Sequence, residues 1–491
     1  MRGTYEGREL REVVQIDAMK MARMGRVIDS TSSWESLGDD LREGVWVVAR
    51  IIHSDGVLPW VKGLRLILFP MPLQGHINPM LELANVLHHK GFSITIIHTQ
   101  FNSLNPTTHP HFIFHSIPVE LSRTEASTND GMAFILLLNV KCFEPFSECL
   151  PRLLSDDDQE PVACLISDLL FSFTQHVAEN LKLPRILLRT SAASSFVAYA
   201  AFPLLLEKGY LPIQESQLEE PVLELPPFKV KDLPVLKTKD PQKYYEVVSG
   251  LKKAVEASCG IIFNTFEDLE GNSLATIRQE FNTPIFPIGP LHKCYPANTS
   301  SSINLLSQDQ KTLFLEIAWG LANRNQRFLW VVRPRLVHGS EWIEPLPSGF
   351  FETLNGRGQI LKWASQKKVL AHQVVGVFWT YNGWNSKLES ICEGVPMICM
   401  PCLSDQMANA RYVSHVWKVG LQLEHGVDRG EIERTIRKIM AEKEGEEIRD
   451  RILMLMEKEK ICIKQGGSSY QSLDGFIKYI LSQFAIQSQG Q

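Results

Sequence analysis

Short apolar runs alternate with amphipathic segments along the chain from about residue 64 onward. The first apolar run covers residues 64–69 and precedes a loop that contains prolines and a glycine, which predicts a buried strand. Asn78 and Pro79 then favour the start of a helix with Asn78 as its N-cap, and Gly91 predicts its end. A strand followed by a helix is the repeating unit of α/β proteins.

The same pattern recurs through both halves of the chain. In the first half, further strands are expected at residues 92–98, 162–167, 185–188, 260–264 and 284–288. In the second half, strands are expected at residues 328–332, 359–362, 375–380, 397–400 and 420–423. Strands that alternate with helices form parallel sheets with right-handed crossovers, so the predicted fold class is α/β.

A polar stretch divides this pattern into two Rossmann-like, doubly wound domains. We expect the first domain at residues 63–290, a linker at 291–310 and the second domain at 311–491, which ends in consecutive helices. Two such domains that face each other would bind ligands between them, at the carboxyl ends of their strands. Residues 1–62 carry interleaved acidic and basic side chains, and the sequence assigns no role to this extension.

Charge and cysteine content narrow the possible functions. The 491 residues carry a formal net charge of −5, which argues against a nucleic-acid-binding surface. No apolar run reaches the ~18 residues that span a bilayer. The nine cysteines are scattered, which favours a reduced, cytoplasmic chain. Cys392, Cys399 and Cys402 have no accompanying histidine, so we expect structural thiols; we also expect a monomer without cofactor or metal.

A predicted strand-to-helix junction in the second half has the residue types of a phosphate site. Residues 383–386 (Gly-Trp-Asn-Ser) follow the strand at 375–380 and open the next helix. The unpaired backbone N–H groups of a helix start attract anions, and a glycine and a hydroxyl suit a phosphate. Glu389 lies about one turn further, where a carboxylate can bind a ribose diol.

Other side chains near this junction suit the base and the sugar of a nucleotide sugar. Trp363 offers a flat face to a base, and Asp405 and Gln406 follow the strand at 397–400, where they can bind sugar hydroxyls. Simpler interpretations remain open for single residues: Trp384 as a core residue, Glu389 as a solvated helix residue and Asp405 as an N-cap. The spacing of the whole set favours a nucleotide-sugar site.

A histidine and an aspartate follow two predicted strands of the first half. His76 is expected in the loop after the first strand, where an imidazole can take the proton of an attacking hydroxyl. Asp168, at the end of the strand at 162–167, can orient the ring and stabilise the imidazolium. A lone histidine is more often a surface or core residue, so the assignment depends on its place in the fold.

These residues lie in segments that resemble a known family. Residues 363–406 resemble, without a gap, the signature box of plant UDP-dependent glycosyltransferases (family 1). The resemblance runs from about Leu64 to the carboxyl end and is closest to the branch with iridoid, steviol glycoside, flavonol and cytokinin glucosyltransferases. It implies the GT-B fold, with the acceptor bound by the amino half and the UDP-sugar by the carboxyl half.

The resemblance also implies an activity and a set of site residues. The expected reaction is inverting transfer of glucose from UDP-glucose to a hydroxyl of a flavonoid, terpenoid/iridoid or hormone, with His76 and Asp168 as catalytic residues. Apolar surface around Phe143, Phe171 and Phe196 is expected to suit such an acceptor. The implied UDP-sugar-binding residues are Thr190, Trp363, Ala364, Gln366, Tyr381, Trp384, Asn385, Ser386, Glu389, Asp405 and Gln406.

The sequence departs from the family pattern at three places. Ser365 replaces a usual proline, and Tyr381 replaces a histidine that contacts the phosphates in the family. After Gln310 a short helix, a strand and a Gly-Ser loop are missing, so the second domain is predicted to lack its first strand. The alternative function is therefore a weakly active or inactive UDP-sugar-binding relic, or a splice variant, of such an enzyme.

Overall fold

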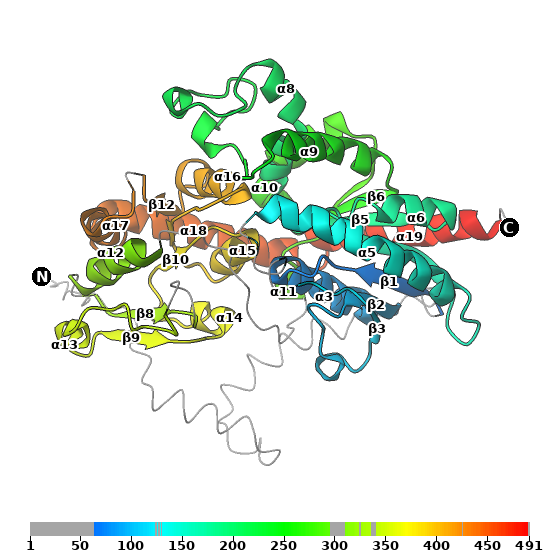
Figure 1. Ribbon diagram of the computed structural model, residues 1–491, viewed down its shortest axis with the longest axis horizontal. Helices are drawn as coiled ribbons and strands as arrows, with labels where there is room; N and C mark the ends of the chain where they lie inside the picture. Colours follow the sequence, from blue (N-terminus) through cyan, green and yellow to red (C-terminus); the bar gives the residue numbers. More distant parts are fainter. Residues whose placement is uncertain are drawn as a thin grey trace, which may run out of the picture.

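The structure is a computed structural model that describes residues 63–489 apart from 123–124, 126–127, 129, 295–309, 324–325, 335–339 and 425. The extension at 1–62 and most of the linker expected at 291–310 lie outside the described residues. The elements that the structure describes are arranged around two groups of strands, one at each end of the longest axis (Figure 1).

The first domain contains a seven-stranded parallel sheet with the order β3-β2-β1-β4-β5-β6-β7. The strands predicted from the sequence in this half are confirmed, and β3 is one that the pattern did not predict. The strands are β1 (Arg65–Phe69), β2 (Ser93–Thr99), β3 (Ile113–Ile117), β4 (Val162–Asp168), β5 (Arg185–Arg189), β6 (Gly260–Phe263) and β7 (Ile285–Pro287). β1 is central because it pairs with both β2 and β4.

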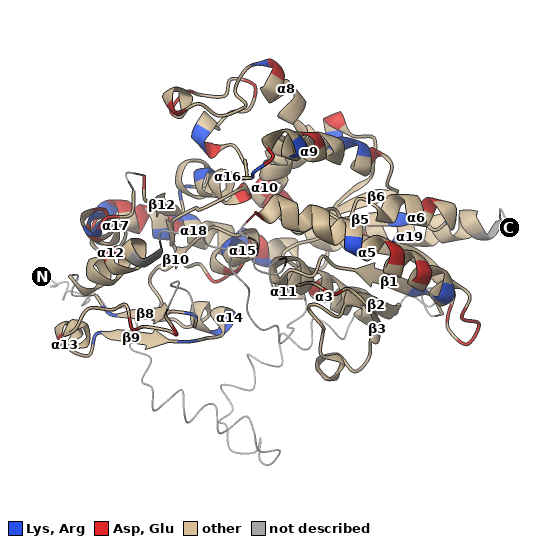
Figure 2. Cartoon of the chain, in the orientation of Figure 1, with Lys and Arg blue, Asp and Glu red and all other residues tan. Residues whose placement is uncertain are grey.

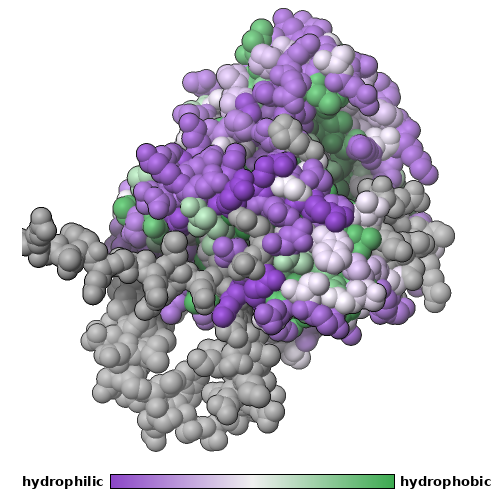
Figure 3. Space-filling model, turned by 90° about the vertical axis from the view of Figure 1, so that its left-hand side faces the viewer, coloured by the Kyte–Doolittle hydropathy of each residue, from purple (hydrophilic) through white to green (hydrophobic). Residues whose placement is uncertain are grey.

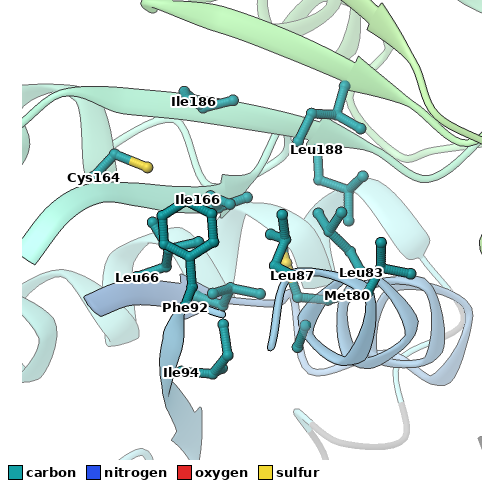
Figure 4. Packing of buried hydrophobic residues seen from close by; sticks show 14 of the residues in the cluster. Leu66, Met80, Leu83, Leu87, Phe92, Ile94, Cys164, Ile166, Ile186 and Leu188 are labelled. Atoms are coloured by element: carbon teal, nitrogen blue, oxygen red, sulfur yellow. The ribbon is translucent and has the colours of Figure 1, made fainter. Parts of the chain in front are cut away.

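Helices on both faces bury this sheet. Leu66 and Ile166 of the strands pack against Met80, Leu83 and Leu87 of α3 in one cluster (Figure 4), and such burial is the main favourable contribution to folding. The helices are α3 (Gln74–His89), α5 (Gly131–Leu154), α6 (Thr174–Asn180), α7 (Ala193–Ala200), α8 (Phe202–Glu207), α9 (Pro241–Glu256), α10 (Glu267–Glu280) and α11 (Leu291–Cys294), with short turns η1 (Pro106–Thr108), η2 (Glu215–Gln217) and η3 (Val230–Asp232).

The second domain has its strands in two separate sheets. A two-stranded sheet holds β8 (Phe328–Val331) and β9 (Gly358–Leu361), and a three-stranded sheet holds β10 (Phe378–Thr380), β11 (Met397–Cys399) and β12 (Gly420–Gln422). All pairs are parallel, and every strand predicted in this half is present. Among the described residues, no strand pairs with both β8 and β10, and Figure 1 shows the two sheets apart.

Helices surround both small sheets. They are α12 (Gln310–Ala322), α13 (Phe350–Leu354), α14 (Gln366–Leu370), α15 (Trp384–Cys392), α16 (Asp405–Arg411), the π-helical turn η4 (Tyr412–Val416), α17 (Arg429–Ala441), α18 (Lys443–Cys462) and α19 (Ser468–Gln489). The last helix returns to the first domain, where Leu473, Phe476 and Ile477 join its core cluster. This return of α19 was not part of the domain division expected from the sequence.

The predicted start of the first helix is wrong by five residues. Helix α3 begins at Gln74, with Leu73 in an extended conformation before it, and Pro79 lies inside the helix. A proline inside a helix has no N–H for the carbonyl four residues earlier, here that of Gly75. That carbonyl instead accepts a hydrogen bond of 2.9 Å from Nδ2 of Asn385 in the second domain, so the proline is tolerated.

Charged side chains of both signs are mixed over the outer helices, as Figure 2 shows for α17 and α18. The end of the molecule shown in Figure 3 is mostly hydrophilic, with hydrophobic residues in a recess. Among the described residues, no helix is both long and apolar enough to cross a membrane.

Candidate active site

A cavity of about 1000 Å³ lies between the two domains. Its walls include the start of α3 and the residues after β4 and β5 on one side, and the starts of α14, α15 and α16 on the other. These are the carboxyl ends of parallel strands, where ligands bind in open α/β sheets. The cavity therefore lies where the sequence predicts the cleft.

His76, Asp168 and Thr190 meet on the first-domain side of the cavity. Nδ1 of His76 lies 2.7 Å from Oδ2 of Asp168, and Oγ1 of Thr190 lies 3.1 Å from the same nitrogen. Because a carboxylate only accepts, Nδ1 carries the proton and Nε2 keeps its lone pair for an acceptor hydroxyl. Asp168 is itself fixed, since its Oδ1 accepts from the backbone N–H of Leu170 at 2.9 Å.

His76 lies in the first turn of α3 and not in a loop, which corrects the sequence prediction. The side chain is 21% exposed, whereas Asp168 is 1% exposed. A buried carboxylate behind a partly exposed imidazole is the arrangement of a general base with its orienting acid.

Gln366, Ser386 and Glu389 form a connected group on the second-domain side. Nε2 of Gln366 donates to Oγ of Ser386 at 3.0 Å and to Oε2 of Glu389 at 2.7 Å. Burial raises the pKa of Glu389, and the bond from Gln366 opposes this shift. Helix α15 begins at Trp384, so Ser386 lies in its first turn and Glu389 one turn later. The anion site predicted at this helix start stays a prediction.

The two tryptophans of the predicted site have different environments. Trp363 is 54% exposed and lines the cavity together with Ala364, so its ring face is accessible. Trp384 is 3% exposed, and its Nε1 donates to the backbone carbonyl of Asn264 in the first domain at 2.7 Å. The core interpretation of Trp384 therefore holds for the indole, which joins the two domains.

Asp405 and Gln406 begin α16 and line the cavity. Oε1 of Gln406 accepts from the backbone N–H groups of Cys402 and Leu403 at 2.9 and 3.2 Å, so the amide nitrogen remains for a sugar. The turn before Asp405 is held against the first domain because Oγ of Ser404 lies 2.6 Å from the hydroxyl of Tyr199.

Tyr381 lies beside an arginine that the sequence analysis missed. Burial raises the pKa of Tyr381 to about 12, and Arg333 lowers it, so the phenol stays protonated and can only donate or accept neutrally. Arg333 lies two residues after the end of β8 and lines the cavity. Its position just after an apolar strand was the available signal, because strand ends carry the ligand-binding residues in this fold class.

The apolar wall of the cavity also differs from expectation. Phe171 and Phe196 are fully buried in the first-domain core, and Phe143 is exposed outside the cavity. The first-domain residues that do line it with apolar surface include Phe134, Leu136, Leu169, Tyr199 and Leu251. Side-chain direction on α5 and α9 decides this, and local sequence does not reveal it.

The cavity continues into the space between β8 and β10. Leu329 and Val331 of β8, and Val377 and Trp379 near β10, line it there. The backbone N–H groups of Phe328 and Val332 point to the β9 side, so strand alternation turns those of Leu329 and Val331 toward this space. Nε1 of Trp379 is buried without a hydrogen-bond partner among the described residues. The space lies where a central strand would pair with both β8 and β10, and apolar side chains line it.

Within the part of the chain that the structure describes, no group of three or more His, Cys, Asp or Glu side chains could hold a metal ion. The cavity wall instead offers backbone N–H groups, Tyr381 and Arg333 to an anionic ligand.

Comparison with known proteins decides the family. Residues 304–455 match the family model of UDP-glucoronosyl and UDP-glucosyl transferases. The chain is 49% identical to UDP-glycosyltransferase 76B1 of Arabidopsis thaliana, over 84% of this chain and 97% of the relative. The chain belongs to the plant family 1 UDP-glycosyltransferases.

Other relatives and solved structures agree with this family. The chain is 40% identical to the flavonol 3-O-glucosyltransferase UGT76E12 of A. thaliana, over 84% of this chain and 96% of that protein. Phytolacca americana UGT2, solved with UDP-2fluoro-glucose and pterostilbene, shares 27% identity, with a TM-score of 0.71 over 85% of this chain and 99% of the other. The fold is GT-B, and this glycosyltransferase family transfers sugar from a UDP-sugar to small molecules.

Proposed function

We propose that the cavity transfers glucose from UDP-glucose to a hydroxyl of a small hydrophobic metabolite, of the flavonoid, terpenoid/iridoid or hormone class, with inversion. The observation that carries this proposal is that His76, held from behind by Asp168, and the Gln366–Ser386–Glu389 group line one cavity from opposite domains. A flavonol glucosyltransferase among the relatives supports the acceptor class.

The donor is bound by the second domain in this proposal. Trp363 stacks on uracil, Glu389 takes the ribose hydroxyls, and the start of α15 with Asn385 and Ser386 receives the diphosphate. Asp405, Gln406 and the backbone at Trp384 border the sugar, and Thr190 reaches it from the first domain. Arg333 and Tyr381 add a cation and a hydrogen-bond donor for the charge that develops on the leaving group.

The transfer step then uses one proton acceptor. Nε2 of His76 takes the proton of the acceptor hydroxyl while its oxygen attacks the anomeric carbon, and Asp168 stabilises the imidazolium. The bond from that carbon to the diphosphate oxygen breaks, and UDP leaves from the opposite face. Attack opposite the leaving group converts the α-linked donor into a β-glucoside.

A second candidate function is binding of a UDP-sugar with weak or absent transfer. The open space between β8 and β10 favours it, because the strand and loop that would complete the sheet and contact the diphosphate are missing after Gln310. Tyr381 also favours weak transfer, since a neutral phenol stabilises a leaving diphosphate less than a cation does.

The test measures UDP binding and transfer separately. Calorimetry with UDP in EDTA should give saturable binding, and mass spectrometry with UDP-glucose and a panel of aglycones should give a mono-glucoside. Binding without product would favour the second candidate. The absence of UDP binding at millimolar ligand, or a strict need for magnesium, would contradict both candidates.

A further inference from the structure

An ion pair joins the two domains beside the group that binds the donor in the proposal above. Nζ of Lys367, the second residue of α14, lies 2.6 Å from Oε1 of Glu82 on α3. The Glu82 carboxylate is 5% exposed and the Lys367 side chain 29%. Lys367 follows Gln366 directly, and Gln366 donates to Glu389. A first-domain carboxylate is therefore tied to the residue next to the donor group.

Lys367 is the cation shared by two buried carboxylates. Burial is the main cause of a Glu82 pKa of about 7; Glu389 adds to this rise, and Lys367 opposes it. Burial also raises the pKa of Glu389, and Lys367 opposes that shift as well. Glu82 and Glu389 thus repel each other, and the ammonium of Lys367 attracts both.

Other charged and titratable groups face this pair from the neighbouring elements. They are His292 and Lys293 on α11 and Glu393 directly after α15, and Glu459 on α18 acts in turn on Lys293. Lys293 is already paired with Glu393 at 2.5 Å, and burial lowers the pKa of His292 well below its usual value. Among the residues that the structure describes, Lys367 is the cation that opposes the raised pKa of both Glu82 and Glu389.

We propose that Lys367 is a positioning residue: anchored by Glu82 of the first domain, it keeps Glu389 charged and directed at the ribose of the donor. This inference rests on the proposed role of Glu389 as the ribose-binding carboxylate. A neutral carboxyl would offer a weaker hydrogen-bond acceptor to the diol than a carboxylate does.

The same pair links the donor side to the catalytic side. Glu82 lies six residues after His76 on α3, which is about 9 Å along a helix. Since α3 carries both His76 and Glu82, the pair ties the start of α14 to the helix of the proposed base. Small errors in the distance between two bound reactants are costly for a reaction between them.

A purely structural pair and a positioning pair predict different pH profiles. If Lys367 only tied the domains together, its removal would weaken UDP binding equally at every pH. If Lys367 keeps Glu389 charged, Lys367→Met should shift the midpoint of the curve of UDP affinity against pH to a higher pH. Glu82→Gln removes a repelling charge and keeps a polar partner for Lys367, so it should move the midpoint downward.

The experiment measures UDP affinity of the full chain by calorimetry from pH 5.5 to 8.5. Lys367→Met should lose about tenfold in affinity near pH 6 and recover part of it near pH 8. Lys367→Arg keeps the charge and should retain the profile of the unchanged chain. The matched control is Lys229→Met, which removes the cation of the exposed pair with Glu219 and should leave UDP binding unchanged.

The outcomes separate this inference from the proposed function. UDP binding by the unchanged chain, with parallel profiles for Lys367→Met, Glu82→Gln and Lys229→Met, would overturn the positioning role alone. The absence of UDP binding by the unchanged chain would overturn the proposed function and the inference with it. Opposite midpoint shifts in Lys367→Met and Glu82→Gln, in variants with comparable melting temperatures, would support the inference even if Lys367→Met is partly destabilised.

Discussion

The two domains of this chain differ in how completely their sheets are built. In the first domain β1 lies between β2 and β4 and pairs with both. In the second domain β8 pairs with β9 and β10 pairs with β11, and none of the described residues lies as a strand between β8 and β10. Without its central strand, the second domain reproduces the first domain's order β3-β2 … β4-β5-β6 as β9-β8 … β10-β11-β12.

The residues proposed for proton transfer and those proposed for donor binding therefore lie on sheets that differ in completeness. The first domain holds His76, the proposed base, on a helix packed against a complete sheet, with Asp168 at the end of a strand paired on both sides. The second domain holds Gln366, Ser386 and Glu389, the proposed donor-binding group, on α14 and α15, close to two open strand edges. The open edges are only partly buried, since Val331 is 40% exposed, and a buried unpaired backbone group costs ~1–3 kcal/mol. We therefore expect the defect in stability and donor binding rather than in proton transfer.

The largest expected effect tests the first domain. His76→Ala should lower turnover ~10²–10⁴-fold, because the acceptor hydroxyl loses its proton acceptor, and UDP affinity should stay unchanged. Steady-state kinetics measures the turnover, and calorimetry measures the UDP affinity. His176→Ala on the exposed surface of α6 is the control. Equal losses of turnover and of UDP affinity in His76→Ala would mean that the domains do not divide these tasks.

A smaller effect concerns a buried lysine of the second domain. Lys387 is fully buried on α15, and its Nζ has no hydrogen-bond partner among the described residues. The ammonium lies 4.4 and 5.0 Å from the ring centres of Trp384 and Trp417. Burial lowers its pKa to about 7, against the attraction of Glu270 and Asp405. Lys387→Met should therefore raise the free energy of unfolding by ~1–4 kcal/mol near pH 7.

The pH dependence gives the sign of this contribution. Between pH 7 and about 10.4 the unfolded chain keeps the proton of Lys387 while the folded chain loses it. Stability from this group thus rises with pH across that window, and Lys387→Met should lack that rise. Urea unfolding at pH 7 and pH 9 checks both statements, and Lys438→Met on the exposed face of α17 is the control. An unchanged or lower stability of Lys387→Met would show that the ammonium is well solvated.

Much of the fold and the location of the site follow from sequence, because buried parallel strands read as continuous apolar runs. Contacts between domains do not follow from it. The start of α3 was misplaced because Asn78 and Pro79 are a local helix-start signal, whereas the carbonyl that Pro79 leaves open is satisfied by Asn385, far away in the chain. The indole of Trp384 likewise depends on Asn264 of the other domain.

Other residues were missed for related reasons. β3 alternates apolar and polar residues over only five positions at the sheet edge, which is weaker than the runs of the central strands. The roles of Lys367 and Arg333 appear only when helix starts and strand ends from both domains are brought to one cavity. Spacing within one segment carries no information about such neighbours.

The measurement that tests the central claim most directly compares the melting temperature of this chain with that of a version in which a family-type strand and Gly-Ser loop are inserted after Gln310. A strand between β8 and β10 would pair the edges at Leu329, Val331 and Trp379 and fill the space between them. Recovery of several kcal/mol should raise the melting temperature by about 5–10 °C. Equal or lower melting temperature of the inserted version would contradict the claim that the second sheet lacks its central strand.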